Sequence, residues 1–361
     1  MRTVVVNLAD RRPVWALPGW VPEEIRAALP QGWRLEMSEE PADGSGDGDA
    51  SASRSLLELA RDCEIYLGYG LPAELVRAAP ALSWAHSGAA GVRGSLTPEL
   101  KASEIVFTNS AGIHARPMAE TALAMLLHFF RGLDFAVRNQ AMRRWSALPY
   151  LRAESPVREL GSATVGIVGY GGIGRALVRL LTAFGSSVLA VRRSVRGRRA
   201  VGADTSSGAD ESDDGATRNV AVFGPDAFPE LLAASDAVVV AVPDTAETRG
   251  LIDGAALAAM KPGAVLVNVS RGGVVDERAL VDALRSGRLR GAGLDVFEHE
   301  PLSCANPLWD LDNVILTPHV SAVTRGFWRR ETDLILHNLR RYLAGAPLGE
   351  WRNVVDPKRG Y

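Results

Sequence analysis

Residues 164–177 of this chain read TVGIVGYGGIGRAL. A short β-branched run leads into a glycine-rich turn, and the turn opens directly into apolar residues at helical spacing. Gly169, Gly171 and Gly174 fit the G-x-G-x-x-G spacing of a dinucleotide-binding turn, in the strand–turn–helix context that the motif requires. The first glycine permits the tight turn, the second lets backbone approach a pyrophosphate, and the third lets the helix pack against the sheet. Because amides at a helix N-terminus attract phosphates, the stretch predicts a bound nicotinamide dinucleotide.

The composition is that of a globular protein, and 361 residues suggest about two domains. Hydrophobic residues make up 47% of the chain, and the formal net charge of −2 gives no general attraction to nucleic acid or an anionic membrane. Cys63 and Cys304 lie far apart in the sequence, so neither a disulfide framework nor a metal cluster is expected. The histidines outside the motifs lack metal-ligand spacing, and we predict no catalytic metal.

The sequence gives no sign of a secretory signal or a membrane span. Residues 1–13 contain no apolar core of a secretory signal. The apolar stretch 121–130 is too short to span a bilayer and is typical of a buried helix. We therefore expect a cytoplasmic protein with no membrane partner.

Short apolar runs alternate with helical patterns along most of the chain, which favours parallel sheets with crossover helices. The strands expected in the first part are 3–6, 65–67, 83–86 and 105–108, with helices at 56–61 and 72–79. A long apolar helix is expected at 117–133. A second series of strands is expected at 164–168, 187–191, 237–241, 264–268, 291–294 and 314–316. An amphipathic helix at 324–344 ends the pattern.

We infer that this last helix returns to pack on the first domain. The predicted fold is α/β, with two Rossmann-like or flavodoxin-like domains built on parallel sheets. A dinucleotide-binding domain, 121–319, is then inserted into a substrate domain formed by 1–120 and 320–361.

Two polar segments interrupt the alternation. Residues 43–54 are rich in Gly, Ser and Asp and predict a mobile surface loop. Residues 192–228 begin with a basic cluster and include 204–214, which contains no large apolar residue. Because such sequence cannot bury enough apolar surface to order itself, a disordered surface insertion is favoured over a binding element.

Three polar residues follow the later strands of the second series. Arg271, Glu300 and His319 each come shortly after an expected strand, where ligands gather in open α/β sheets. Taken singly, each has an ordinary explanation as a loop or turn residue. Their order and local sequence make them candidates for catalysis.

Together with the glycine motif, these segments strongly resemble the D-isomer-specific 2-hydroxyacid dehydrogenase family over most of the chain. The segments that carry the resemblance are 83–92 (SWAHSGAAGV), Asn109 with 119–120 (AE), 160–174, 236–243 (DAVVVAVP) with 247–248 (ET), 268–276 (NVSRGGVVD), 294–301 (LDVFEHEP) and 317–319 (TPH). The combination is specific, although no single piece is. In this family the terminal parts form a substrate domain around the nucleotide domain, and a homodimer is expected.

By this resemblance, His319 is the acid/base and Glu300 its partner. Hydride transfer to a 2-oxo acid puts negative charge on the former carbonyl oxygen, so a positioned proton donor is needed, and imidazole suits this role. An ionised Glu300 is expected to favour the imidazolium form. Arg271 supplies a planar fork for the substrate carboxylate and carbonyl. Amides near Ala90 and Gly91 would complete the carboxylate site, as the similar family loop implies.

The resemblance and the motif together give a set of expected coenzyme contacts. The predicted coenzyme-binding residues are Gly169, Gly171, Gly172, Ile173, Gly174, Arg192, Arg193, Ser194, Pro243, Thr248 and Asp295. Asp295 is expected to bond the nicotinamide carboxamide, or else simply to end a strand.

The residues that follow the second strand of the nucleotide domain indicate which coenzyme is bound. NAD sites usually place an acid after this strand for the ribose hydroxyls, whereas here the strand runs into Arg192, Arg193 and Ser194. An arginine there would pair with a 2′-phosphate, so NADP is favoured over NAD. The alternative is that both arginines begin the polar insertion and touch nothing.

The leading hypothesis is an NAD(P)-dependent reductase of a small 2-oxo acid, glyoxylate or hydroxypyruvate first. The alternatives are a dinucleotide-sensing regulatory protein of the same fold and a dehydrogenase for bulkier 2-oxo acids. Glu300 argues against the formate dehydrogenase branch, where Gln is expected beside the histidine. His86 lies near the substrate loop or is a structural strand-end residue. Trp145 covers a substrate site, or packs in a core or an interface.

Overall fold

The computed structural model describes residues 2–38, 40, 51–195, 198–200 and 219–358. The chain divides into two compact units. Unit 1 comprises Met1–His114 and Val323–Tyr361, and unit 2 is Ala115–Ala322. The expected boundary after 120 lies instead after His114, because the whole of helix α5 belongs to unit 2, and the one expected after 319 lies after Ala322. Which unit serves substrate and which serves coenzyme stays a prediction.

Unit 1 is built on a five-stranded parallel sheet with the order β2-β1-β3-β4-β5. Its strands are β1 (Arg2–Asn7), β2 (Trp33–Met37), β3 (Cys63–Gly68), β4 (Trp84–Ser87) and β5 (Val106–Asn109). This is the flavodoxin-like order, in which the sequence of strand addition changes side between β1 and β3 while all strands stay parallel. The inner strands β1, β3 and β4 are largely buried on both faces, and the continuous apolar run Val4–Val6 of β1 reflects this.

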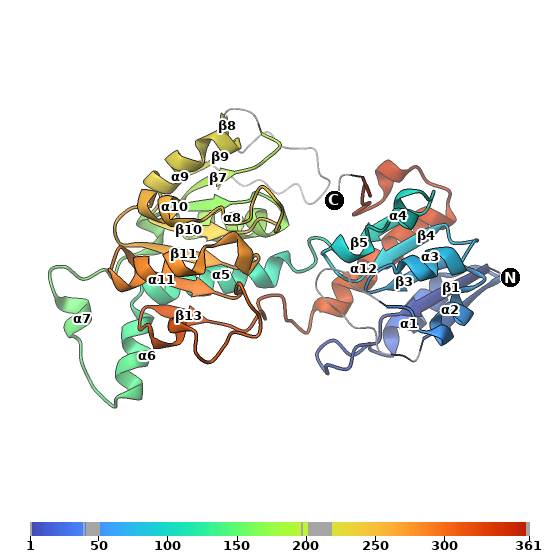
Figure 1. Ribbon diagram of the computed structural model, residues 1–361, viewed down its shortest axis with the longest axis horizontal. Coiled ribbons are helices and arrows are strands. Elements are labelled where there is room, and N and C mark those ends of the chain that lie inside the picture. Colours follow the sequence, from blue (N-terminus) through green and yellow to red (C-terminus); the bar gives the residue numbers. More distant parts are fainter. Residues whose placement is uncertain (1, 39, 41–50, 196–197, 201–218, 359–361) are drawn as a thin grey trace. The chain divides into compact units, whose positions relative to one another are not determined.

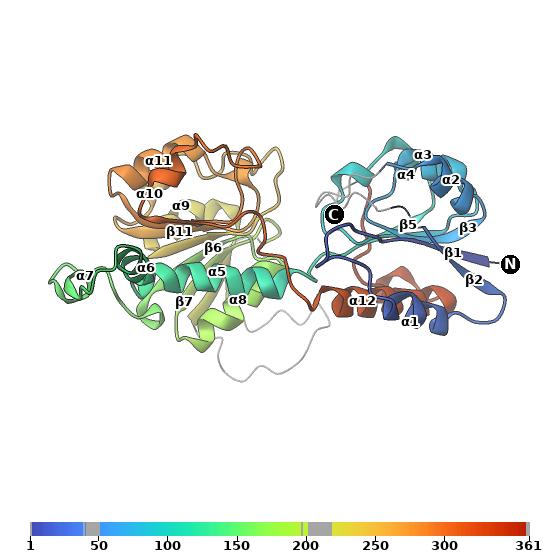
Figure 2. The same ribbon diagram turned by 90° about the horizontal axis from the view of Figure 1, so that it is seen from below.

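Helices cover both faces of this sheet (Figure 2). They are α1 (Trp20–Ala28), α2 (Arg54–Ala60), α3 (Ala73–Ala78), α4 (Pro98–Lys101) and α12 (Phe327–Leu343). α1 and α12 lie on one face, where Phe327, Trp328 and Ile335 share a core with β1 and β3. The last helix therefore returns to the first domain, as expected. α2, α3 and α4 cover the other face.

Unit 2 is built on an eight-stranded sheet with the order β13-β12-β11-β10-β6-β7-β9-β8. Its strands are β6 (Thr164–Val168), β7 (Ser187–Val191), β8 (Arg198–Ala200), β9 (Val220–Phe223), β10 (Ala237–Val240), β11 (Ala264–Asn268), β12 (Leu289–Leu294) and β13 (Val314–Leu316). All pairs are parallel except β8 with β9. From β6 outward this is the Rossmann order, so the α/β prediction with two parallel sheets is confirmed.

The helices of unit 2 also form two layers. They are α5 (Ala115–Phe130), α6 (Leu133–Ala141), α7 (Leu148–Leu151), α8 (Gly172–Ala183), α9 (Phe228–Ala234), α10 (Gly254–Ala259) and α11 (Glu277–Arg285). α5 and α8 lie on one face of the sheet, and α9, α10 and α11 on the other (Figures 1 and 2). Asp253 and Asp276 cap α10 and α11 by accepting a hydrogen bond from the backbone of the first turn.

Two expectations about local structure were wrong. The insertion 192–228 is not irregular throughout, because β9 is buried and pairs with β7, and α9 begins at Phe228. Within the same segment, β8 adds one antiparallel edge strand to the otherwise parallel sheet. The helix expected at 117–133 ends at Phe130, since Gly132 adopts φ 66° and breaks it from α6. The predicted loop 43–54 and the stretch 204–214 fall mostly or wholly outside the described residues.

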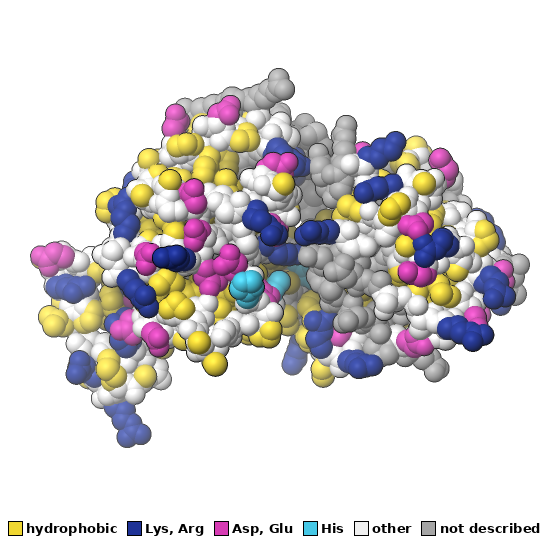
Figure 3. Space-filling view, viewed as in Figure 1, with side chains coloured by type: hydrophobic (Ala, Val, Ile, Leu, Met, Phe, Trp, Pro, Cys, Tyr) yellow, Lys and Arg dark blue, Asp and Glu magenta, His cyan; other side chains and the backbone are white. Residues whose placement is uncertain are grey.

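The segment 133–151, here called the arm, carries α6 and α7 and exposes large apolar side chains (Figure 3). Trp145 is fully exposed (101%), Leu148 is 72% exposed and Leu151 is 80% exposed. The prediction that Trp145 packs in a core is therefore wrong within one chain, since its side chain is fully exposed there.

Candidate functional site

The turn between β6 and α8 has the geometry that a dinucleotide-binding motif requires. Gly169 adopts φ 106°, a conformation that other residues rarely adopt, and its N–H donates to the Val191 carbonyl at 3.1 Å. A Cβ on Gly169 would lie 2.5 Å from the Ala241 carbonyl oxygen, at the end of β10. A Cβ on Gly174 would lie 2.3 Å from the Gly169 carbonyl oxygen. These two glycines are required by the fold itself.

Gly171 differs, because a Cβ added there would meet nothing within 4 Å among the described residues. It is the N-cap of α8, with no side-chain cap on the first turn of that helix in the described structure. Gly171 and Gly172 are exposed, and the first-turn amides, which include those of Gly172, Ile173 and Gly174, have no partner within the helix and lie at the positive end of a twelve-residue helix. This cradle fits a pyrophosphate.

The position of the turn in the sheet agrees with this assignment. β6 lies between β10 and β7, so the chain leaves β6 on one side and returns on the other. Such a reversal leaves a crevice outside the carboxyl ends of the strands, where nucleotides bind in open α/β sheets.

The loops after β7 and β10 flank that turn. Arg192 is half-buried and its N–H donates to the Phe223 carbonyl at 2.9 Å, while Arg193 and Ser194 are exposed. After β10, the Thr248 hydroxyl donates to the Pro243 carbonyl at 2.5 Å.

Arg193 also lies close to an acid from the β10 loop. The pKa of Glu247 is lowered from its ordinary value by a hydrogen bond with the Thr245 side chain, by a backbone N–H and by the charge of Arg193. The charge of Arg193, in the β7 loop, thus acts on an acid of the β10 loop.

Glu300 and His319 form a pair. His319 Nδ1 lies 2.7 Å from Glu300 Oε2, and Glu300 Oε1 accepts a hydrogen bond from the Phe297 N–H at 3.0 Å. With Glu300 ionised, Nδ1 carries the proton of this bond, which directs the other ring nitrogen, Nε2, outward. The His319 side chain is 43% exposed, and within the described part of the chain Nε2 has no hydrogen-bond partner. It is the nitrogen available for proton transfer.

The backbone of His319 adopts φ 54°, a left-handed conformation that costs a non-glycine residue about 1–2 kcal/mol. Its N–H donates to the Asp295 carbonyl at 2.8 Å. The Asp295 carboxylate, which is fully buried, accepts hydrogen bonds from the Thr317 hydroxyl at 2.6 Å and from the Val320 and Ser321 N–H groups at 2.9 Å. Asp295 thus holds the loop that carries His319. Its expected contact with the nicotinamide carboxamide stays a prediction.

Arg271 lies in the turn after β11. The Asn268 amide donates to the Arg271 carbonyl at 3.1 Å, and an Arg271 guanidinium N–H donates to the Ser270 carbonyl at 2.9 Å. A Cβ on the neighbouring Gly272 would lie 1.8 Å from the Phe297 carbonyl oxygen, so the turn is pressed against the segment that binds Glu300. Sequence reasoning did not single out Asn268, which fixes this turn.

The fold brings these three residues to one edge of the sheet. Arg271 follows β11, Glu300 follows β12 and His319 follows β13, and these strands are neighbours in parallel register, with Asn268 opposite Leu294 and Leu294 opposite Leu316. The glycine turn follows β6 at the same edge, because all these strands run in the same direction.

The predicted substrate loop lies in unit 1, after β4. The Ala89 carbonyl accepts a hydrogen bond from the Ser110 N–H at 3.2 Å, and the Ala90 carbonyl accepts one from the Asn109 amide at 2.8 Å. Because N–H and C=O of a trans peptide point in opposite directions, the N–H groups of Ala90 and Gly91 are turned away from β5. In the described structure neither N–H has an acceptor, and Ala90 is exposed.

His86 is not part of an open site. It is fully buried, with Nδ1 2.8 Å from the Thr108 hydroxyl and Nε2 2.9 Å from Glu331 Oε1. The structural interpretation of this histidine is therefore correct.

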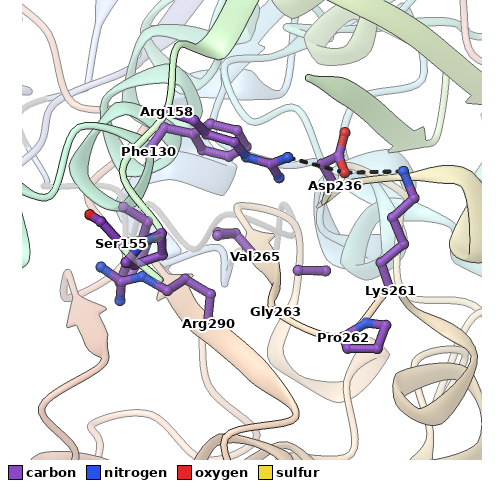
Figure 4. A pocket seen from close by; sticks show the side chains of 12 residues that line it. Phe130, Ser155, Arg158, Asp236, Lys261, Pro262, Gly263, Val265 and Arg290 are labelled. Atoms are coloured by element: carbon purple, nitrogen blue, oxygen red, sulfur yellow. Dashed lines mark hydrogen bonds and ion pairs between the residues drawn. The ribbon is translucent and has the colours of Figure 1, made fainter. Parts of the chain in front are cut away.

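A cavity of about 320 Å³ lies at the opposite edge of the unit 2 sheet, before β10 and β11 (Figure 4). Asp236 Oδ1 lies 3.0 Å from Lys261 and 3.4 Å from Arg158, and Arg290 pairs with Asp134 at 2.7 Å. Burial alone would raise the pKa of Asp236, but hydrogen bonds from a backbone amide and from Lys261 lower it overall. Its charges are paired and it lies far from the strand carboxyl ends, so we do not assign the chemistry to this cavity.

Within the described residues, no group of three or more His, Cys, Asp or Glu side chains could hold a metal ion. No helix in the described ranges is long and apolar enough to cross a membrane. The absence of a catalytic metal and the cytoplasmic location stay predictions.

The fold and the glycine turn define a class: two-unit α/β proteins in which a dinucleotide-binding Rossmann unit is inserted between two parts of a flavodoxin-like unit. A family profile described as "D-isomer specific 2-hydroxyacid dehydrogenase, NAD binding domain" matches residues 123–321. The chain belongs to the D-isomer-specific 2-hydroxyacid dehydrogenase family.

Individual relatives agree with this. A D-3-phosphoglycerate dehydrogenase of Mycobacterium leprae is 35% identical over 273 residues, which cover 76% of this chain and 47% of that protein. A glyoxylate reductase of Thermococcus onnurineus is 35% identical over 300 residues, covering 80% and 83% of the two chains. A D-isomer-specific 2-hydroxyacid dehydrogenase of Xanthobacter autotrophicus Py2, crystallised with NADPH and MES, has a TM-score of 0.73 at 30% identity and is matched over 99% of both chains. The chain spans about half the length of the first curated relatives it matches.

Proposed function

We propose that this chain is an NAD(P)-dependent reductase that interconverts a small 2-oxo acid and its D-2-hydroxy acid, with glyoxylate or hydroxypyruvate as substrate. The observation that carries the proposal is the His319–Glu300 pair, held with Arg271 at the carboxyl edge that also bears the dinucleotide turn. The similarity to a glyoxylate reductase supports the choice of substrate.

The residues take separate roles in this reaction. Bound nicotinamide supplies the hydride chemistry. His319 Nε2 gives a proton to the carbonyl oxygen as the carbonyl carbon is reduced, and Glu300 stabilises the ring that carries this proton. Arg271 offers a permanently charged fork to a carboxylate or a polarised carbonyl. The amides of Ala90 and Gly91 are donors suited to a carboxylate.

A panel of 2-oxo acids, followed by nicotinamide absorbance, tests the proposal. We expect the highest kcat/KM with glyoxylate or hydroxypyruvate. A clear preference for a branched, aromatic or phosphorylated 2-oxo acid would correct the substrate while keeping the reaction. Tight coenzyme binding without turnover of any acid would instead favour the dinucleotide-sensing alternative and reject the enzyme.

We further propose that NADP is the preferred coenzyme. The support is the pair Arg192 and Arg193 directly after β7, at the place where an acid would serve the ribose of NAD. The kcat/KM should therefore be higher with NADPH than with NADH, and Arg193→Ala should lower the NADPH value selectively. A clear advantage of NADH in the parent protein would reject the preference.

We also propose that two copies associate through the arm. Its exposed apolar side chains, Trp145, Leu148 and Leu151 among them, would be costly to leave in water. Light scattering after size exclusion should give a dimer for the parent and a monomer for Leu148→Glu. The matched control is Leu348→Glu, which changes a half-exposed leucine of unit 1 and should leave the dimer intact. A parent that is monomeric at micromolar concentration would contradict the proposal.

A further inference from the structure

The N–H groups of Ala90 and Gly91 are turned outward because two consecutive residues at the end of β5, Asn109 and Ser110, bind the carbonyls of the same peptide groups. Asn109 donates its side-chain amide to the Ala90 carbonyl at 2.8 Å. Ser110 donates its backbone N–H to the Ala89 carbonyl at 3.2 Å and its hydroxyl to the Ser87 carbonyl at 2.9 Å. Three carbonyls of the loop and its entry, those of Ser87, Ala89 and Ala90, are thereby held from one side.

Ser110 is itself held by a buried acid from a distant part of the chain. Glu331, on α12, is fully buried, and its Oε2 lies 2.7 Å from the Ser110 hydroxyl oxygen, so this carboxylate and the Ser87 carbonyl share the single hydroxyl proton. Its Oε1 lies 2.9 Å from His86 Nε2, and His86 Nδ1 lies 2.8 Å from the Thr108 hydroxyl. Burying an ionisable side chain is costly unless its polar atoms are bonded, and here both carboxylate oxygens are bonded.

Asn109 is clamped from the other side by the tail of the chain. The Asn353 amide donates to the Asn109 carbonyl at 3.0 Å and to the Ala111 carbonyl at 2.7 Å. The Asn109 N–H donates to the Asn353 carbonyl at 3.1 Å. Asn353 adopts φ 56°, a conformation that asparagine tolerates better than most residues.

Although Ser110, His86 and Glu331 include a hydroxyl, an imidazole and a carboxylate, they do not form a nucleophilic site. All three residues are fully buried, and the Ser110 hydroxyl is already engaged with Glu331 and the Ser87 carbonyl. The network is suited to holding backbone rather than to reacting with a substrate.

We propose that Asn109, Ser110, His86 and Glu331 are positioning residues that preset the amides of Ala90 and Gly91 as a binding site for the carboxylate of the 2-oxo acid. This rests on the proposed function. Donors that are already aimed cost little reorganisation when the anion arrives, so losing the frame weakens substrate binding more than it slows the chemistry. None of these four residues needs to touch the substrate.

The test is Asn109→Leu, an uncharged change of similar size that removes the hydrogen bond to the Ala90 carbonyl, together with the one that Asn109 Oδ1 accepts from the Ala111 N–H at 3.2 Å. The KM for glyoxylate should rise about tenfold or more, as expected for loss of one hydrogen bond to a charged group. The kcat should change much less, and the Kd of NADPH should stay within about twofold, because the dinucleotide turn lies in unit 2. Thr3→Val is the matched control, since Thr3 is fully buried in unit 1 and accepts one hydrogen bond from Arg34 at 2.9 Å. It should leave KM unchanged.

Each result decides the question. A parent that turns over glyoxylate and an Asn109→Leu variant with the same KM would overturn the positioning role alone. An equal rise in KM with Thr3→Val would also overturn it, as a general effect of weakening unit 1. A parent that turns over no 2-oxo acid would overturn the proposed function and this inference with it. If Asn109→Leu does not fold, Ser110→Ala decides instead: it removes the bonds to Glu331 and Ser87 and should raise KM in the same selective way.

Discussion

Alanine at Gly171 should weaken coenzyme binding and leave stability almost unchanged, whereas alanine at Gly174 should lower stability. In Gly171→Ala the new methyl group meets no atom within 4 Å of the described structure, and the φ of −95° suits any residue. Alanine is a poorer N-cap than glycine by some tenths of a kcal/mol, and the reduced freedom of the unfolded chain offsets this by about 0.4–1 kcal/mol. The free energy of unfolding should therefore change by less than about 1 kcal/mol.

Coenzyme binding by Gly171→Ala should nevertheless weaken, because the methyl group occupies the space in front of the α8 amides. Each hydrogen bond from an amide to a charged phosphate contributes about 1.5–3 kcal/mol, so loss of one weakens binding about 10- to 100-fold. Gly174→Ala should instead lower the free energy of unfolding, since its methyl group would lie 2.3 Å from the Gly169 carbonyl oxygen and force α8 away from the turn. Such overpacking costs about 1–3 kcal/mol.

Urea unfolding and titration calorimetry with NADPH measure both quantities on the same samples. The reasoning is refuted if Gly171→Ala binds NADPH as tightly as the parent, or if Gly174→Ala is as stable as the parent. A loss of stability in Gly171→Ala would show that the space in front of α8 is filled by the protein itself.

Three further changes test other parts of the structure. Glu300→Gln keeps an acceptor for the Phe297 N–H but cannot balance a charged imidazole, so kcat should fall about 100-fold while the Kd of NADPH stays the same. An unchanged kcat would contradict the role of Glu300 as the partner of His319. Asp295→Ala leaves buried donors of the His319 loop unpaired, and the free energy of unfolding should drop by about 3 kcal/mol or more in a denaturant melt; a drop below about 1 kcal/mol would count against its anchoring role. Burial raises the pKa of Cys63 to about 12, whereas Cys304 is exposed, so a thiol reagent at pH 8 should label one cysteine per native chain rapidly. Rapid labelling of both would show that β3 is not buried.

Several strands of unit 2 were predicted with the correct limits. β6, β7, β11 and β13 begin and end where the apolar runs predict. The central strands β6 and β11 are largely buried and have few polar residues to obscure their limits. β9 was missed because its four residues follow a long polar stretch, and only pairing with β7 identifies them as a strand. α5 was predicted too long because one glycine, Gly132, outweighs the apolar pattern around it.

The residues proposed for the chemistry could be selected from the sequence because parallel strands bring their carboxyl ends to one edge of a sheet. That rule places Arg271, Glu300 and His319 together without any knowledge of side-chain contacts. The residues that hold the loops could not be found in the same way. Glu331 reaches His86 and Ser110 across more than 200 residues of sequence, and such pairings are set by the packing of α12 on the sheet. Asp295 shows the same limit, because its position after β12 does not reveal that its carboxylate faces the next loop.

The most direct test of the proposed chemistry is a single-turnover measurement with glyoxylate added to the NADPH complex of the parent and of His319→Ala. We predict rapid loss of nicotinamide absorbance in the parent and a rate lower by about two to four orders of magnitude in the variant, with NADPH bound equally well to both. Equal rates in the two proteins would contradict the assignment of His319 as proton donor, and no reaction in either would contradict the proposed activity.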